Sequence, residues 1–134
     1  MYPPSMTVIY VIDGSEVTGL ERFWEVVGEA VNGRGGYFGR NLDAFADCLS
    51  GGMGTPDDAD FVIEWRDHAA AARALGHEET ARHLRRTLDR AHATGRERVR
   101  AELAEALAGR GPTLFDQLVQ IITERTAPGT LRLR

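Results

Sequence analysis

The sequence predicts a small α/β protein with a three-stranded parallel sheet flanked by helices. Residues 7–12 and 61–65 are short runs of β-branched and aromatic side chains, which are typical of buried strands. Residues 130–134 alternate leucine with arginine, which is typical of a strand with one apolar face. Helical segments separate the three runs, and strands that alternate with helices indicate a parallel sheet with right-handed connections.

Two helices are expected between the first and second strands. The first spans about residues 19–31, because its apolar side chains repeat at intervals of three and four, and Asn32-Gly33 is a typical helix end. The second spans about residues 41–49, with Asn41 as a suitable N-cap. The apolar positions of the first helix are Leu20, Phe23, Trp24, Val27 and Val31.

The remaining helices are expected between the second and third strands. Residues 67–109 are rich in Ala, Arg and Glu, and we expect two or three helices there, broken near Gly76 and Gly95. Another helix begins after residues 111–113 and stops before residues 128–129. Its apolar side comprises Leu114, Phe115, Leu118, Val119, Ile121 and Ile122. The length of 134 residues predicts a single domain, 1–134.

Charge is distributed unevenly along the chain. The formal net charge of −4 combines −7 over residues 1–66 with +3 over residues 67–134. The acidic half would repel phosphates, which argues against direct contact with nucleic acid. An acidic surface favours instead a cationic protein partner that long-range attraction steers toward it.

The chain shows no signature of a metal site, a cofactor or a membrane segment. Its single cysteine, Cys48, excludes an internal disulfide and a cysteine-rich metal site. The four histidines lack the spacing of metal ligands, and the loop at residues 33–39 lacks a phosphate-binding lysine. The first residues do not resemble a secretory signal, and no apolar run reaches the roughly 18 residues of a membrane span. We therefore expect a cytoplasmic protein without a cofactor.

Residues 35–52, which read GGYFGRNLDAFADCLSGG, combine a glycine-rich loop with a short acidic helix. Asp43 and Asp47 are four residues apart, which places both carboxylates on one face of a helix. Phe45 and Leu49 belong to the opposite, apolar face. Tyr37 lies between glycines in the loop, where exposure is expected. This arrangement suits docking to a basic surface better than it suits catalysis.

These residues resemble the barstar family of intracellular ribonuclease inhibitors. The resemblance is strongest over residues 37–43, which read YFGRNLD, and continues through Asp47 and Cys48. Residues 62–66, VIEWR, resemble the family's second strand. The resemblance covers residues 7–68 well and about 113–134 in outline. It implies a small parallel sheet flanked by helices, in agreement with the pattern of predicted elements.

The resemblance also implies a partner and a binding surface. Family members block the cationic substrate cleft of a secreted or toxic ribonuclease with the second helix and the loop before it. Tyr37 would pack on a catalytic base of the nuclease, and Asp43 and Asp47 would face its Arg and Lys residues. The implied role is immunity or self-protection, as in a toxin–antitoxin pair, without catalysis. The implied partner-binding residues are Tyr37, Gly39, Asn41, Asp43, Asp47, Gly51 and Glu124.

Several features depart from the family pattern. Arg40 stands where members often carry an acid, Ala46 replaces a tryptophan, and Gly52 replaces another aromatic residue. The segment at about 67–110 has no counterpart that the resemblance identifies, so we interpret it as an inserted helical segment. The position of the acid in the last helix, assigned to Glu124, leaves a shift of two residues open.

Other interpretations of the same residues remain open. Asp43 and Asp47 would also fit an ordinary solvent-facing helix surface. The three substitutions would fit an interaction module that keeps the scaffold without inhibiting a nuclease. A small hydrolase would use Cys48, or an aspartate, with His68. Cys48 is at no helix N-terminus and has no basic neighbour, so a buried structural thiol fits it better.

Overall fold

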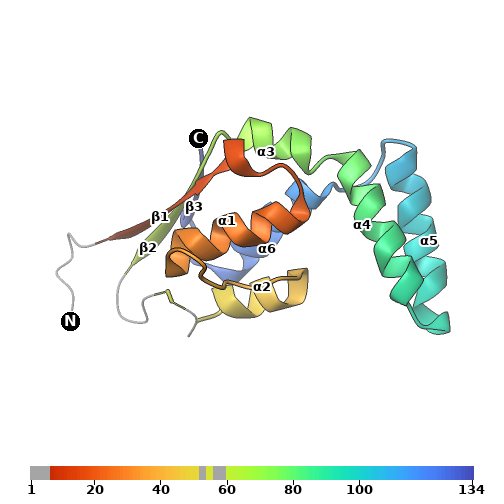
Figure 1. Cartoon of the computed structure of the whole chain (residues 1–134), viewed down its shortest axis with the longest axis horizontal. Coiled ribbons are helices and arrows are strands. Elements are labelled where there is room, and N and C mark those ends of the chain that lie inside the picture. The colour runs from red at the N-terminus through yellow and green to blue at the C-terminus, as the bar shows by residue number, and fades with distance from the viewer. Residues whose placement is uncertain (1–6, 52–53, 56–59) are drawn as a thin grey trace.

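The structure is a computed structural model that describes residues 7–51, 54–55 and 60–134. Its elements follow the predicted order of strand, two helices, strand, further helices and strand (Figure 1). They are β1 (Val8–Asp13), a short 3-10 turn η1 (Gly14–Glu16), α1 (Leu20–Asn32), α2 (Leu42–Leu49), β2 (Phe61–Arg66), α3 (His68–Ala74), α4 (His77–Arg90), α5 (Ala93–Leu107), α6 (Leu114–Arg125) and β3 (Leu131–Leu133).

The sheet has the order β1-β2-β3, and both strand pairs are parallel, which confirms the predicted fold class. Tyr10 is in register with Ile63, and Ile63 is in register with Leu131. The order of the strands across the sheet is the same as their order in the chain. Both crossovers therefore move in the same direction, and if each is right-handed, the connecting helices lie on one face of the sheet. Figure 1 shows α1, α6 and α2 on the same side of the strands.

An aromatic cluster joins the sheet to these helices. Trp65 of β2 is fully buried, and its ring centroid lies 5.3 Å from that of Phe23 in α1 and 5.1 Å from that of Phe115 in α6. The ring of Phe45 in α2 lies 5.6 Å from that of Phe23. Such ring pairs add to the energy of apolar burial. The cluster therefore joins α2 to α1 through the ring of Phe45, which also lies 5.7 Å from that of Trp24.

The start of α6 shows how its sequence sets its position. The Thr113 hydroxyl accepts a hydrogen bond from the backbone N of Asp116, and the Asp116 carboxylate accepts one from the backbone N of Thr113. This capping box satisfies two backbone donors that would otherwise lack partners. The predicted apolar side of the helix is confirmed, since Leu114, Leu118 and Ile122 are fully buried.

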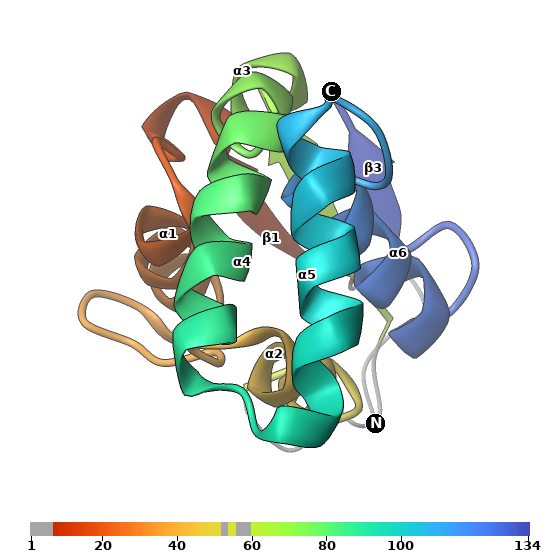
Figure 2. The same cartoon turned by 90° about the vertical axis from the view of Figure 1, so that its right-hand side faces the viewer.

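Helices α4 and α5 form a hairpin at one end of the molecule (Figure 1), and Figure 2 shows the two helices side by side. The hairpin has a small apolar core of its own, formed by Ala81, Leu84, Val99 and Ala106. The buried Thr80 hydroxyl ties the start of α4 to the start of α6, because it accepts a hydrogen bond from the backbone N of Leu114 at 2.9 Å.

One predicted helix boundary in this hairpin is wrong. The predicted break at Gly76 is confirmed, because Gly76 is the N-cap of α4. The second break falls instead at Ala91 and His92, whose backbone is extended, and Gly95 lies within the first turn of α5. A glycine costs a helix only about 1 kcal/mol, which the packing of α5 on α4 outweighs.

None of the helices in the described part of the chain is long and apolar enough to cross a lipid bilayer.

Candidate protein-docking site

A glycine-rich loop at residues 33–41 connects α1 to α2 and is anchored to both. Phe38 is fully buried, with its ring centroid 5.9 Å from that of Phe45. Gly39 has a φ of +91°, and a Cβ atom there would lie 2.6 Å from the backbone N of Phe45. A larger side chain would suffer both the unfavourable backbone conformation and this clash. Gly39 therefore sets the path of the loop.

A capping hydrogen bond and a buried apolar face fix the orientation of α2 after the loop. The Asn41 side chain accepts a hydrogen bond from the backbone N of Ala44 at 2.8 Å, which confirms the predicted N-cap. Phe45 and Leu49 are buried, as predicted for the apolar face. Ala46 is also buried, so in this chain the position adds no exposed surface.

The two carboxylates of α2 face solvent. Asp43 and Asp47 are both exposed, and among the described residues neither forms an ion pair or a side-chain hydrogen bond. Asp43 lies in the first turn of α2, where the helix dipole favours a negative charge. Both side chains are therefore available to an external cation.

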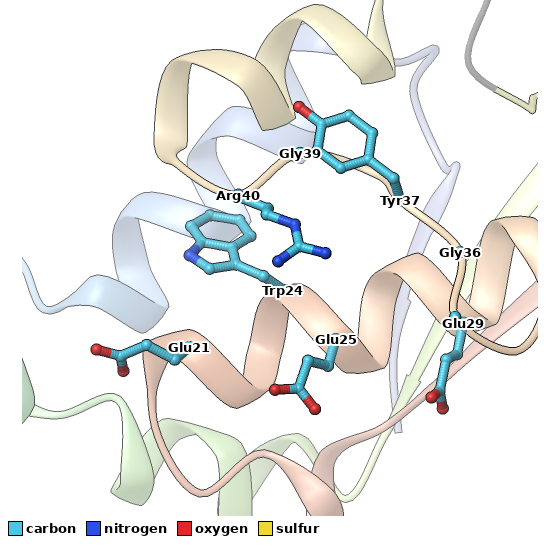
Figure 3. A pocket seen from close by; sticks show the side chains of 9 residues that line it. Glu21, Trp24, Glu25, Glu29, Gly36, Tyr37, Gly39 and Arg40 are labelled. Carbon is cyan, nitrogen blue, oxygen red and sulfur yellow. The ribbon is translucent and has the colours of Figure 1, made fainter.

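A groove of about 370 Å³ runs between α1 and the loop (Figure 3). Tyr37 lines it and is 41% exposed, as the sequence predicts. Trp24 forms part of its wall, and Glu25 and Glu29 of α1 lie along its edge. Figure 3 shows the Arg40 guanidinium projecting over the groove between Trp24 and Tyr37. The groove thus combines an exposed aromatic ring, carboxylates and one cation.

The last two predicted contact residues lie on different elements, Gly51 just after the C-terminal end of α2 and Glu124 near the end of α6. Gly51 follows the helix and is exposed, with a φ of +123°. Its neighbour Ser50 accepts a hydrogen bond from Arg125 at the end of α6, at 3.2 Å. Glu124 is exposed on α6 and accepts a hydrogen bond from Gln120 at 2.8 Å. The predicted partner-binding roles of Gly51 and Glu124 stay predictions, and Gly52 lies outside the described residues.

The environment of Cys48 fits a structural thiol better than a nucleophile. Cys48 is only 4% exposed, and burial, together with the charge of Asp47, raises the pKa of its thiol. A raised pKa lowers the fraction of reactive thiolate at neutral pH. His68 interacts instead with the backbone carbonyl of Arg134 and stacks on Phe115. Within the described ranges, no cluster of side chains could hold a metal ion.

Sequence reasoning missed the contribution of α1 to this surface. Glu21, Glu25 and Glu29 recur at intervals of four, a spacing that places them on one exposed face. That spacing is visible in the sequence, but its position beside Tyr37 depends on how α1 packs against the loop. Glu21 pairs with Arg82 and Glu25 with Arg22, whereas Glu29 forms no ion pair with any described residue.

These features define a small parallel α/β protein that presents an acidic helix and an aromatic loop to solvent. A family model described as Barstar (barnase inhibitor) matches residues 7–103. The chain belongs to this family, whose members inhibit ribonucleases, and a ribonuclease is the kind of partner that membership indicates. A search of curated proteins finds no match to the chain.

The matched range bears on the segment interpreted as an insertion. It includes α3, α4 and most of α5, so the match does not itself separate residues 67–110 from the rest of the family domain. The insertion and the single-domain boundaries therefore stay predictions. The outline resemblance at residues 113–134 lies beyond the matched range.

Proposed function

We propose that this protein is a stoichiometric inhibitor of a ribonuclease, and that it places α2 and the loop at residues 33–41 in the enzyme's substrate cleft. The observation that carries the proposal is the exposed pair Asp43 and Asp47, which no described cation of the chain neutralises. Tyr37 supplies an exposed ring on the loop that leads to α2.

The charge of a ribonuclease explains why such a pair would bind. An enzyme that holds an anionic RNA backbone needs a cationic active site. Carboxylates held on a rigid helix would bind this positive charge without the entropy cost of ordering a flexible segment. In the complex, Asp47 would be desolvated, so it must pair with an arginine or lysine of the enzyme.

The first experiment titrates ribonuclease activity with the protein, using barnase and any nuclease encoded beside this chain's gene. We expect activity to disappear at one equivalent of the protein. Asp47→Ala should raise the inhibition constant at least ~100-fold, because removing one partner of a buried ion pair costs about 3–5 kcal/mol. Inhibition constants from a fluorogenic RNA substrate provide the measurement.

A matched control is Glu97→Ala, which removes an acid that is highly exposed on α5. Its inhibition constant should equal that of the parent protein. If the Asp47 variant inhibits as well as the parent does, α2 is not the docking element. If the parent inhibits none of these nucleases, the inhibitor function itself is contradicted.

We further propose that the protein acts in the cytoplasm as the immunity partner of a nuclease toxin. The lone, buried Cys48 suits a reducing compartment, since it forms no disulfide and is shielded from oxidation. A nuclease gene adjacent to this one would support the pairing.

A second candidate function is an interaction module without nuclease inhibition. Arg40 favours it, because this exposed cation lies on the face that would meet a cationic cleft. This second function would be favoured if the protein binds a partner through Asp47 while the activity of the nuclease stays intact.

A further inference from the structure

A second groove lies between α1 and α4, on the other side of Arg40. Its volume is about 420 Å³, and Glu21, Trp24 and Arg40 belong to both grooves. The wall that α4 contributes comprises Arg82, His83, Arg86, Thr87 and Arg90, with Ala91 just beyond the helix. Asn41, the N-cap of α2, also lines the groove.

This second groove carries a net positive charge. Its lining contains four arginines but a single carboxylate, that of Glu21. Arg82 and Arg86 both pair with Glu21, and Arg82 also pairs with Glu79. The other two, Arg40 and Arg90, have no ion-pair partner within the described ranges. Burial lowers the pKa of His83, so the arginines supply the positive charge.

The groove is held open by contacts between α1 and α4. The Glu79 carboxylate accepts a hydrogen bond from the backbone N of Leu20 at 2.7 Å, and Arg82 bonds to Glu21 at 2.6 Å. Each contact joins residues about sixty positions apart in sequence and fixes α4 beside the start of α1. The two walls are therefore positioned before a partner arrives.

The groove also continues the proposed docking surface. Asn41 is one of its lining residues, and Asp43, the first exposed carboxylate of α2, follows two residues later. Arg90, at the C-terminal end of α4, lines the same groove as Asn41, the N-cap of α2. A partner seated on α2 would thus reach the cationic groove with an adjoining part of its surface.

We propose that the groove between α1 and α4 is a second docking surface, which accepts an acidic segment of the protein partner that binds α2. The proposal rests on the proposed function for the identity of that partner as a ribonuclease. Arg40 and Arg90 bind the carboxylates of this segment from the two sides of the groove. The partner's binding surface is then bipolar, with a cationic cleft for α2 and an acidic rim for the groove.

This arrangement explains Arg40. A cation on the docking face would oppose a uniformly cationic partner, because like charges that come close at an interface repel. Beside an acidic rim, the same cation is attractive and selects among nucleases. Arg40 and Arg90 are therefore specificity-determining residues, whereas Asp43 and Asp47 recognise the cleft common to such enzymes.

The first test needs no nuclease and uses a blocked hexaglutamate peptide as the probe. The peptide is titrated into the full ¹⁵N-labelled chain at low salt, and the Trp24 indole N–H and the backbone amides of residues 86–91 are followed by NMR. We expect saturable shifts that weaken at least ~10-fold in affinity in Arg90→Glu and in Arg40→Glu. Arg90→Gln, which avoids a new negative charge at the end of α4, should give an intermediate loss.

Arg85→Glu is the matched control, because Arg85 is exposed on the same helix but does not line the groove. Its affinity for the peptide should stay within about twofold of the parent value. Equal losses in the Arg85 and Arg90 variants, or no saturable shift, would overturn the proposal. So would the same shifts at lower concentrations of inorganic phosphate or of a short RNA, since these would indicate a site for phosphate groups.

The second test uses any ribonuclease that the parent protein inhibits. Arg90→Glu should raise the inhibition constant at least ~10-fold, and Arg85→Glu should leave it unchanged. If Asp47→Ala abolishes inhibition while Arg90→Glu does not affect it, the second surface is contradicted and the inhibitor function stands. If the peptide binds as expected but no nuclease is inhibited, the groove stands and the inhibitor function fails.

Discussion

At the scale of single residues, Gly39 shows how a loop is fitted to a helix. Its backbone lies in the left-handed region, and a Cβ atom would meet the backbone of Phe45 and Ala44 within 3.0 Å. The loop can therefore reach the N-terminus of α2 only because this residue has no side chain. This contact is the structural reason for a glycine immediately before Arg40 and Asn41.

We predict that Gly39→Ala lowers the free energy of unfolding by more than about 2 kcal/mol, because backbone strain and a backbone clash add. Gly35→Ala is the control, since Gly35 has a φ of +74° but nothing within 4 Å of its Cβ position. The free energy of unfolding of the Gly35 variant should fall by about 1 kcal/mol, because only the left-handed backbone conformation is unfavourable there. Urea denaturation provides the measurement, and equal losses would show that the contact with Phe45 is unimportant.

The sequence predicted some of the residue-scale features and not others. The Asn41 cap and the exposure of Tyr37 follow from local rules, since capping and loop glycines are properties of neighbouring residues. The buried contact of Gly39 depends on where α2 packs, so no local rule could reveal it. The same applies to Glu25 and Glu29, whose spacing is visible but whose position beside Tyr37 is set by packing.

At the scale of elements, the α4–α5 hairpin is attached to α1 through a cluster of charged groups. Hydrogen bonding from Arg82 holds the pKa of Glu21 at about 2, below its ordinary value of 4.5. The pKa of Glu79 is also lowered, because hydrogen bonds from Arg82 and from the backbone N of Leu20 outweigh the opposing effect of burial. The attachment thus requires both carboxylates to be ionised.

This attachment should make folding stability depend on pH in the acidic range. Because Glu21 has a lower pKa when folded than when unfolded, its contribution is complete above pH 4.5 and is lost as the pH falls toward 2. We predict that the free energy of unfolding decreases less for Glu21→Gln than for the parent protein as the pH falls through this range. Chemical denaturation at a series of pH values measures the difference, and salt should reduce it because Glu21 is about half exposed.

Glu97→Gln serves as the comparison, because the Glu97 carboxylate lies 3.9 Å from Arg100 on the exposed surface of α5. Its free energy of unfolding should change with pH in the same way as that of the parent protein. If the Glu21 variant also follows the parent curve, the ion pairs between α1 and α4 do not stabilise the fold.

At the scale of the whole molecule, the uneven charge should control association. The acidic half of the chain presents α2, and attraction to a cationic partner would accelerate encounter at low ionic strength. We predict that the association rate with an inhibited ribonuclease falls about tenfold or more between about 20 and 500 mM salt. Stopped-flow fluorescence measures this rate, and a rate independent of salt would contradict electrostatic steering.

The sequence also predicted the architecture of the whole molecule, but not how its parts meet. The strand patterns and the order of elements were sufficient for a parallel three-stranded sheet, because alternation with helices leaves few topologies. The position of the hairpin depends on contacts such as Glu79 with Leu20, which join distant parts of the chain. The groove between α1 and α4 therefore became visible only in three dimensions.

The strand order has a consequence for synthesis on the ribosome. β2 is central, yet its second neighbour, β3, emerges only after all of α3 to α6. During that interval the nascent chain carries an apolar strand with one unpaired edge, which is a template for aggregation. The hairpin α4–α5 can fold in the meantime, since its contacts are local. Translation that stalls before Leu131 would consequently leave an aggregation-prone intermediate rather than a nearly native protein.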